Sequence, residues 1–116
     1  MLDSLMKELE RVDGVVFAYV HGGFIEMEVF RDIDVAVWIS DPRDAFSHEV
    51  ELSARLEASL KTAIDLHVLN RAPLPFKHHV LTRGRLLFSK DETLRVGLVD
   101  ETVRQYADVR MLKGLR

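Results

Sequence analysis

The sequence contains no cysteine, and only three of its 116 residues are proline. The absence of cysteine excludes disulfide scaffolds, thiolate metal sites and cysteine nucleophiles. An excess of positive charge is also missing, because the formal net charge is −3 and the isoelectric point is near 5.9. Broad electrostatic binding to nucleic acid needs a basic face. We therefore expect no direct contact with nucleic acid.

The N-terminal stretch "MLDSLMKELERVDG" lacks the continuous apolar run of a signal peptide or a membrane span. Its charged residues alternate with apolar residues at helical spacing, which is typical of an amphipathic helix. Together with the lack of cysteine, this pattern predicts a cytoplasmic protein with no membrane partner.

The composition is that of a globular domain, with 47% hydrophobic and 30% charged residues. A chain of 116 residues has about the usual size of one domain, and residues 1–116 are expected to form a single domain. We see no internal repeat, low-complexity tract or interdomain linker.

Hydrophobic periodicity predicts an alternation of helices and strands along the chain. A short helical turn over 24–31 would fit directly after the glycines, and a short helix opens at Pro75 and runs to Leu81. The other predicted helices span 2–12, 43–62 and 91–112, and the predicted strands span 15–20, 32–40, 63–69 and 84–89. This order predicts the α/β (α+β) fold class, with a small mixed β-sheet flanked by helices.

The two longer predicted helices each carry an apolar stripe. We expect the stripe of 43–62 to face the core and most of the stripe of 91–112 to pack on the sheet. Any surplus of the last stripe would suit a partner protein, and a homodimer is left open. The stripes comprise Phe46, Val50, Leu52, Leu56 and Leu60 in the first helix, and Leu94, Leu98, Val99, Val103, Tyr106, Val109 and Leu112 in the second.

Two carboxylates, Asp32 and Asp34, stand at the start of the apolar strand "DIDVAVWIS". Side chains alternate faces along a strand, so both acids point the same way, with Cα atoms about 6.6 Å apart. Asp65 lies on the polar face of the later strand "AIDLHVL". If the two strands are neighbours, about 4.8 Å apart, Asp65 joins the pair.

Three close carboxylates without a counterion repel one another, and proteins usually keep such clusters for function. Mg²⁺ prefers hard oxygen ligands and leaves coordination positions for substrate phosphates. The three acids therefore predict a magnesium site for phosphoryl or nucleotidyl transfer. The alternative is that an Asp-x-Asp arises by chance and that an aspartate before a strand merely caps a turn.

The histidines show no established spacing with other metal ligands, so a zinc site is not expected at His21, His67, His78 or His79. His67 shares the predicted face of Asp65. Two interpretations stay open for it, a catalytic role and a partly buried histidine bonded to the backbone.

The order of strand, Gly-Gly turn, "DIDVAV", helix, strand with one inward aspartate and "APLPFKHHVLTRGRLLFSKDE" resembles the minimal nucleotidyltransferases of the DNA polymerase β superfamily. Among these, the chain is similar to MntA-type antitoxins paired with HEPN-domain toxins, and the resemblance covers nearly the whole sequence. It implies a polymerase β palm-like fold. It also places Gly22, Asp32, Asp34 and Asp65 at the family's functional positions.

The resemblance implies Mg²⁺-dependent transfer of AMP from ATP onto a hydroxyl, a tyrosine of the HEPN toxin, so that the protein acts as an antitoxin. Asp32 and Asp34 would bind both magnesium ions. Asp65 would complete the catalytic metal site and accept the proton of the attacking hydroxyl. Gly22 and Gly23 would bring backbone donors to the triphosphate.

Three departures from the family pattern favour an alternative, a catalytically weak or inactive member that neutralises its partner by binding. The family serine is Gly23 here, Arg31 precedes the first metal aspartate, and the spacer between them is short and lacks a second glycine. An aminoglycoside-type transferase is disfavoured, because a chain this short lacks a second domain to enclose an antibiotic.

Overall fold

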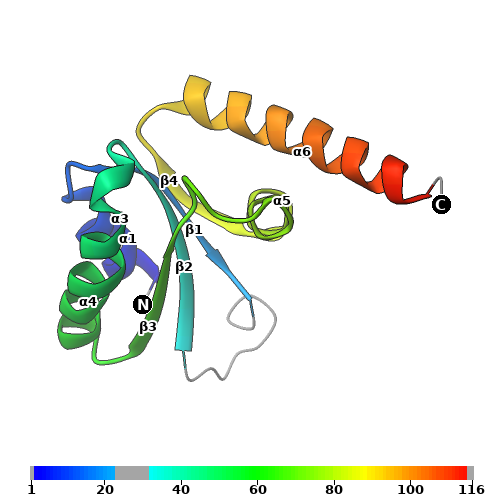
Figure 1. Ribbon diagram of the computed structural model, residues 1–116. Helices are drawn as coiled ribbons and strands as arrows, with labels where there is room; N and C mark the ends of the chain where they lie inside the picture. Colours follow the sequence, from blue (N-terminus) through cyan, green and yellow to red (C-terminus); the bar gives the residue numbers. More distant parts are fainter. Residues whose placement is uncertain (1, 23–31, 115–116) are drawn as a thin grey trace.

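The computed structural model describes residues 2–22 and 32–114 (Figure 1). The predicted order of helices and strands is confirmed in these ranges. The helical elements are α1 (Leu2–Glu10), η1 (Pro42–Asp44), α3 (Ala45–Ser47), η2 (His48–Leu52), α4 (Ser53–Leu60), α5 (Leu74–Arg83) and α6 (Glu92–Gly114). The strands are β1 (Val15–His21), β2 (Asp32–Ile39), β3 (Ala63–Val68) and β4 (Arg85–Ser89).

The strands form one mixed sheet in the order β3-β2-β1-β4. β1 pairs antiparallel with both β2 and β4, whereas β2 pairs parallel with β3. The parallel pair requires a crossover, which the helical stretch from η1 to α4 supplies. The predicted mixed sheet flanked by helices is confirmed, and β3 lies at one edge of it.

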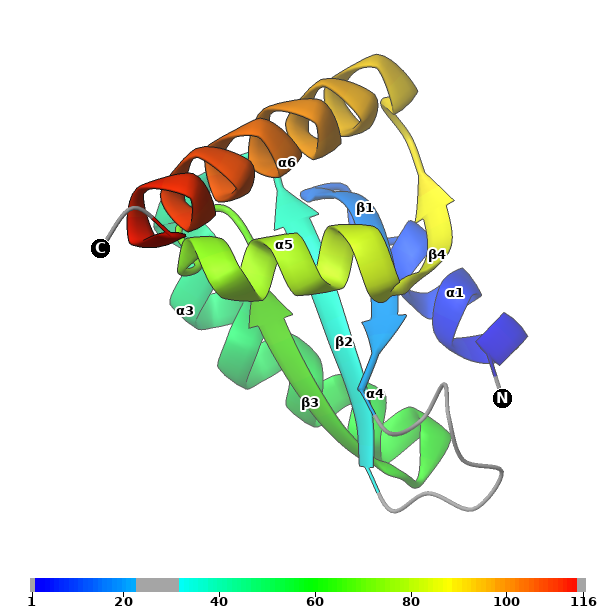
Figure 2. The same cartoon turned by 90° about the vertical axis from the view of Figure 1, so that its right-hand side faces the viewer.

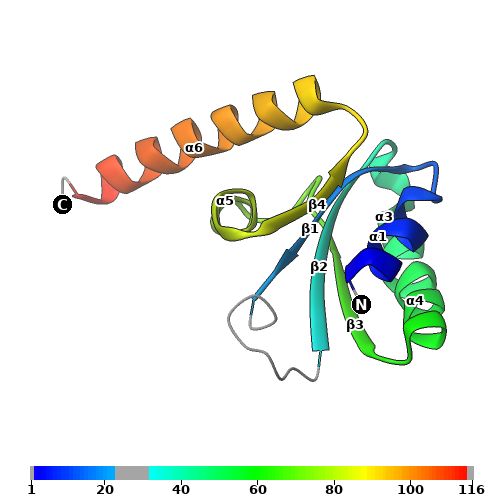
Figure 3. The ribbon, with the colours of Figure 1, turned by 180° about the vertical axis from the view of Figure 1, so that it is seen from behind.

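The sheet has an apolar layer on each face. One face carries Ile33, Val35 and Val37 of β2, which are fully buried under α1 and α4. The other face carries Ala36 of β2 together with Phe17, Tyr19, Leu69 and Val80. Figures 1 and 3 show α1, α3 and α4 on the first side of the sheet and α5 and α6 on the second. Strand alternation therefore places Asp32 and Asp34 on the α5 side.

The helical stretch predicted over 43–62 is present but not uniform, because a π-helical segment, η2, separates α3 from α4. Leu52 and Leu56 are buried as predicted. Phe46 and Val50 were expected on the same stripe, and this is wrong, since their side chains are 77% and 50% exposed. A π-helical turn holds an extra residue, so the residues before it are rotated relative to those after it.

The last helix does not pack on the sheet along its length, which corrects the prediction for its apolar stripe. α6 packs across α5, which is seen end-on in Figure 1 and lengthwise in Figure 2, and its C-terminal end projects away from the sheet (Figure 1). Val103 and Leu112 of the predicted stripe are 40% and 68% exposed, while Leu98 reaches the apolar layer of the sheet. The physical reason is that α5 occupies the space between α6 and the sheet.

Within the ranges that the structure describes, no helix is both long and apolar enough to cross a membrane.

Candidate functional site

The site begins with a carboxylate pair across two neighbouring strands. Asp34 of β2 and Asp65 of β3 are direct partners in the parallel ladder. Asp32 lies two residues before Asp34 on the same face and pairs with Ala63. Asp32 and Asp65 are exposed, and Asp34 is half-buried. The prediction that Asp65 lies beside the other two aspartates is therefore confirmed, while the roles of the three stay predictions.

Gly22 lies against Asp34 on the side away from Asp65. It follows β1, whose last residue His21 pairs with Asp34. Its φ angle is +74°, and a Cβ atom added to it would lie 2.5 Å from Oδ2 of Asp34. The position therefore requires glycine for its backbone conformation and for its close approach. Gly23, the predicted turn over 24–31 and Arg31 lie outside the described residues.

His67 pairs with the third aspartate. Its Nε2 atom lies 3.0 Å from Oδ2 of Asp65, two residues earlier on the same face of β3. An ionised carboxylate can only accept hydrogen bonds, so the imidazole N–H donates in this pair. The structure therefore shows that the polar partner of the His67 ring is the Asp65 carboxylate. This contact occupies one oxygen of Asp65.

An aromatic side chain from α5 covers this row of residues. The ring centroid of Phe76 lies 5.4 Å from that of His21 and 5.3 Å from that of His67. His21 is only 7% exposed, and burial lowers its pKa although the nearby charge of Asp34 acts in the opposite direction. Sequence reasoning missed Phe76. An aromatic residue at the start of a helix gives no local sign of which side chains it will cover.

The donor set suits a hard cation, because carboxylate oxygens are the ligands that Mg²⁺ prefers. No Lys or Arg in the described part of the chain forms an ion pair with Asp32, Asp34 or Asp65. In the same ranges, no three His, Asp or Glu side chains are grouped closely enough to hold a metal ion. The backbone register thus brings three carboxylates to one end of the sheet. In the described residues, their side chains are not close enough together to surround a metal ion.

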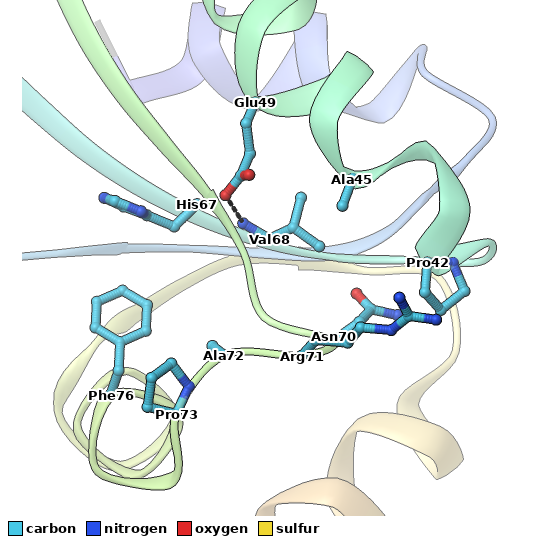
Figure 4. Close-up of a pocket in the computed structure, with 10 residues that line it drawn as sticks. All are labelled: Pro42, Ala45, Glu49, His67, Val68, Asn70, Arg71, Ala72, Pro73 and Phe76. Carbon is cyan, nitrogen blue, oxygen red and sulfur yellow. Dashed lines mark hydrogen bonds between the residues drawn. The ribbon is translucent and has the colours of Figure 1, made fainter.

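A cavity of about 430 Å³ lies beside this row, at the outer edge of β3 (Figure 4). His67 and Phe76 border it at one end, and Pro42 borders it at the other (Figure 4). Glu49 reaches over the strand edge, where one of its carboxylate oxygens accepts a hydrogen bond of 3.1 Å from the backbone N–H of Val68. The remaining lining residues are Ala45, Val68, Asn70, Arg71, Ala72 and Pro73. No sequence motif indicated this cavity, since its walls come from segments that meet only in the folded chain.

The fold is similar to that of several solved toxin–antitoxin proteins. A mutant form of the toxin–antitoxin MntA-HpeT gives a TM-score of 0.82 at 20% identity, covering 99% of this chain and 93% of that chain. A toxin–antitoxin structure with AMP-PNP gives 0.81 at 22% identity, covering 98% and 93%. A tri-AMPylated Shewanella oneidensis HEPN toxin in complex with its MNT antitoxin gives 0.78 at 22% identity, covering 98% and 90%. At these identities the likeness demonstrates a shared fold.

No curated protein sequence matches the chain. The family described as "Polymerase beta, Nucleotidyltransferase" matches residues 3–93, which contain all three aspartates and both glycines. The resemblance to polymerase β nucleotidyltransferases that was predicted from the sequence is thereby confirmed. This chain belongs to the polymerase beta nucleotidyltransferase family.

Proposed function

We propose that this chain is a cytoplasmic antitoxin that transfers AMP from ATP to a tyrosine hydroxyl of a HEPN-domain toxin, with Mg²⁺ as the cofactor. The observation that carries the proposal is the register that sets Asp34 beside Asp65, with Gly22 closing on Asp34 from the other side. Two of the structural neighbours support the choice of reaction. One contains AMP-PNP, and the other contains an AMPylated HEPN toxin.

We infer that Asp32, Asp34 and Asp65 are the magnesium ligands, and that their side chains move closer together than the structure has them when the ion binds. When bound, the metal supplies Lewis acidity toward the triphosphate and lowers the pKa of the acceptor hydroxyl. Asp34 is flanked by Gly22 on one side and by Asp65 on the other. From this arrangement we infer that the phosphates bind on the β1 side of the site and the acceptor on the β3 side.

In the transfer, the tyrosine oxygen attacks the α-phosphorus of ATP, and the bond from that phosphorus to the departing pyrophosphate breaks. Asp65 accepts the proton of the hydroxyl. His67 holds one oxygen of Asp65 at 3.0 Å and so orients the carboxylate for this role. Gly22 lets the backbone approach the phosphates, because no side chain stands between them.

The alternative is a member of the fold that neutralises its partner by binding, with weak or absent catalysis. It rests on Gly23, which replaces the family serine and removes a hydroxyl from the phosphate side. A backbone N–H at Gly23 can still bind phosphate. The enzyme and the binding protein would therefore have the same partner, and they would differ in whether AMP is transferred to it.

The test is incubation of the protein with α-labelled ATP, Mg²⁺ and a HEPN-domain toxin as the acceptor. We expect label on the partner from the wild type, and loss of at least about a hundredfold in Asp34→Asn and Asp65→Asn. Asp108→Asn, which removes an exposed carboxylate of α6, is the matched control and should label normally. Tight binding of the partner without label, unaffected by Asp34→Asn, would replace the enzyme by the binding alternative.

The metal is tested separately by titrating Mn²⁺ into the protein and following its electron paramagnetic resonance signal. The wild type should bind Mn²⁺, and Asp34→Asn should bind it more weakly. Undiminished AMP transfer in the presence of EDTA would contradict the magnesium requirement.

A further inference from the structure

We propose that the cavity at the outer edge of β3 binds the polypeptide segment of the partner protein that carries the acceptor tyrosine. This inference rests on the proposed function and names where its second substrate docks. Three properties of the cavity carry it: its side of the site, its connection to Asp65 and its lining.

The cavity lies on the acceptor side of the carboxylates. Gly22 contacts Asp34 from the β1 side, while Asp65 lies on β3, the edge strand. The cavity borders the same edge strand two residues further along, at His67. With the phosphates on the side of Gly22, as proposed above, a hydroxyl that gives its proton to Asp65 arrives from the side of the cavity.

The cavity connects directly to Asp65 through one side chain. His67 contributes to its lining, and its Nε2 atom lies 3.0 Å from Asp65. Phe76 borders the cavity and packs against the rings of both His67 and His21. An aromatic ring placed beside Phe76 and His67 would therefore lie next to the His67–Asp65 pair.

The lining suits an aromatic side chain with its flanking backbone. Its walls are mainly apolar, from Ala45, Val68, Ala72, Pro73 and Phe76, and Glu49 and Arg71 add one carboxylate and one guanidinium. The volume of about 430 Å³ falls within the range of about 300–1,000 Å³ that is usual for ligand sites. Because β3 is an edge strand, a protein segment reaches this place without crossing the sheet.

The test places a larger side chain at Ala72, a loop residue that lines the cavity. Ala72→Trp should raise the KM for the HEPN-domain partner about tenfold and weaken its binding in calorimetry by a similar factor. Ala72→Leu should do the same to a smaller extent, and this graded pair separates filling of the cavity from misfolding. Ala58→Trp, on the exposed face of α4, is the matched control and should leave both quantities unchanged.

Affinity for AMP-PNP with Mg²⁺, measured on the same variants, distinguishes the two substrates. We expect it to stay within about twofold of the wild type in Ala72→Trp. A parallel loss of AMP-PNP affinity would overturn the proposal, because the cavity would then hold the nucleotide. Unchanged partner binding and KM in Ala72→Trp would overturn it as well.

Different results would contradict the proposed docking site and the proposed AMP transfer. If the wild type labels no partner but Ala72→Trp still weakens partner binding, AMP transfer is wrong and the docking site stands. If the wild type labels its partner and Ala72→Trp labels it with an unchanged KM, the enzyme stands and the docking site is wrong.

Discussion

Gly22 and Asp34 are in such close contact that a single added carbon atom would not fit between them. A Cβ atom on Gly22 would lie 2.5 Å from Oδ2 of Asp34, and the φ angle of Gly22 is +74°. The atom in the way belongs to the end of a side chain, which can rotate. The cost of a larger residue should therefore appear in the position of the carboxylate more than in the fold.

Gly22→Ala should abolish most AMP transfer while lowering the free energy of unfolding by only about 1–2 kcal/mol, the cost of a left-handed backbone for alanine. Urea unfolding and the labelled-ATP assay measure the two effects. Wild-type transfer by this variant would show that the close approach to Asp34 is not needed for the reaction.

Gly97→Ala provides the opposite case in the same chain. Gly97 lies within α6, and beyond its chain neighbours and the local helix backbone no atom lies within 4 Å of a Cβ added to it. Alanine should therefore raise the free energy of unfolding by about 0.5–1 kcal/mol, with no change in AMP transfer. Destabilisation of this variant in urea would contradict the continuous helix described for Glu92–Gly114.

Tyr19→Phe should loosen the start of α6. The Tyr19 hydroxyl is buried in the sheet and accepts a hydrogen bond of 2.7 Å from the Arg95 guanidinium, which also pairs with Glu92. Loss of a hydrogen bond to a charged group should cost about 1–2 kcal/mol of unfolding free energy. Faster amide exchange at the start of α6 would accompany it.

Tyr106→Phe is the matched control for that experiment. The Tyr106 ring stacks on His78 at a centroid distance of 3.8 Å, and phenylalanine preserves this contact. Its unfolding free energy should stay within about 0.5 kcal/mol of the wild type. If both variants lose the same stability, the Arg95 hydrogen bond contributes nothing specific.

Stability should fall as the pH drops through the range where His21 titrates in the unfolded chain. Burial lowers the pKa of His21 below its usual value of 6.5 in the folded protein. Below about pH 6.5 the unfolded chain therefore binds a proton that the folded chain does not, so folding becomes less favourable. The slope can reach at most about 1.4 kcal/mol per pH unit and vanishes below the pKa of the folded state.

The measurement is urea unfolding of metal-free protein between pH 7.5 and pH 5, conditions chosen to bracket the usual histidine pKa of about 6.5. His21→Leu should show a shallower decline than the wild type, because it removes this one titrating group. Parallel curves for the two proteins would show that His21 does not cause the decline.

Asn70→Ala should destabilise the end of β2 beside the cavity. The Asn70 amide accepts a hydrogen bond of 3.0 Å from the Ile39 N–H and donates one of 2.8 Å to the Ile39 carbonyl. Because Ile39 is buried, alanine leaves both backbone groups without this partner, at a cost of about 2 kcal/mol. Thermal or urea unfolding would measure it.

Gln105→Ala is the control, since it removes an amide that donates a hydrogen bond of 3.2 Å to Glu101 on the exposed side of α6. Its effect should stay within about 0.5 kcal/mol. An equal loss in both variants would contradict the special role of the buried Ile39 groups.

The sequence by itself determined the features that depend on local periodicity. Alternation along the strands puts Asp32 and Asp34 on one face and Ile33, Val35 and Val37 on the other, and the structure has both sets where the pattern predicts them. The order of helices and strands followed from the same rules. These properties are local because a side chain's face depends only on the backbone around it.

Tertiary structure alone decided which of these residues meet. The register of β3 against β2 sets Asp65 opposite Asp34, and a shift of one residue would have turned Asp65 to the apolar face. The cover of Phe76 over His21 and His67, the cavity beside β3 and the packing of α6 on α5 also come from segments distant in the chain. Such contacts depend on how whole layers pack, and no local period in the sequence encodes them.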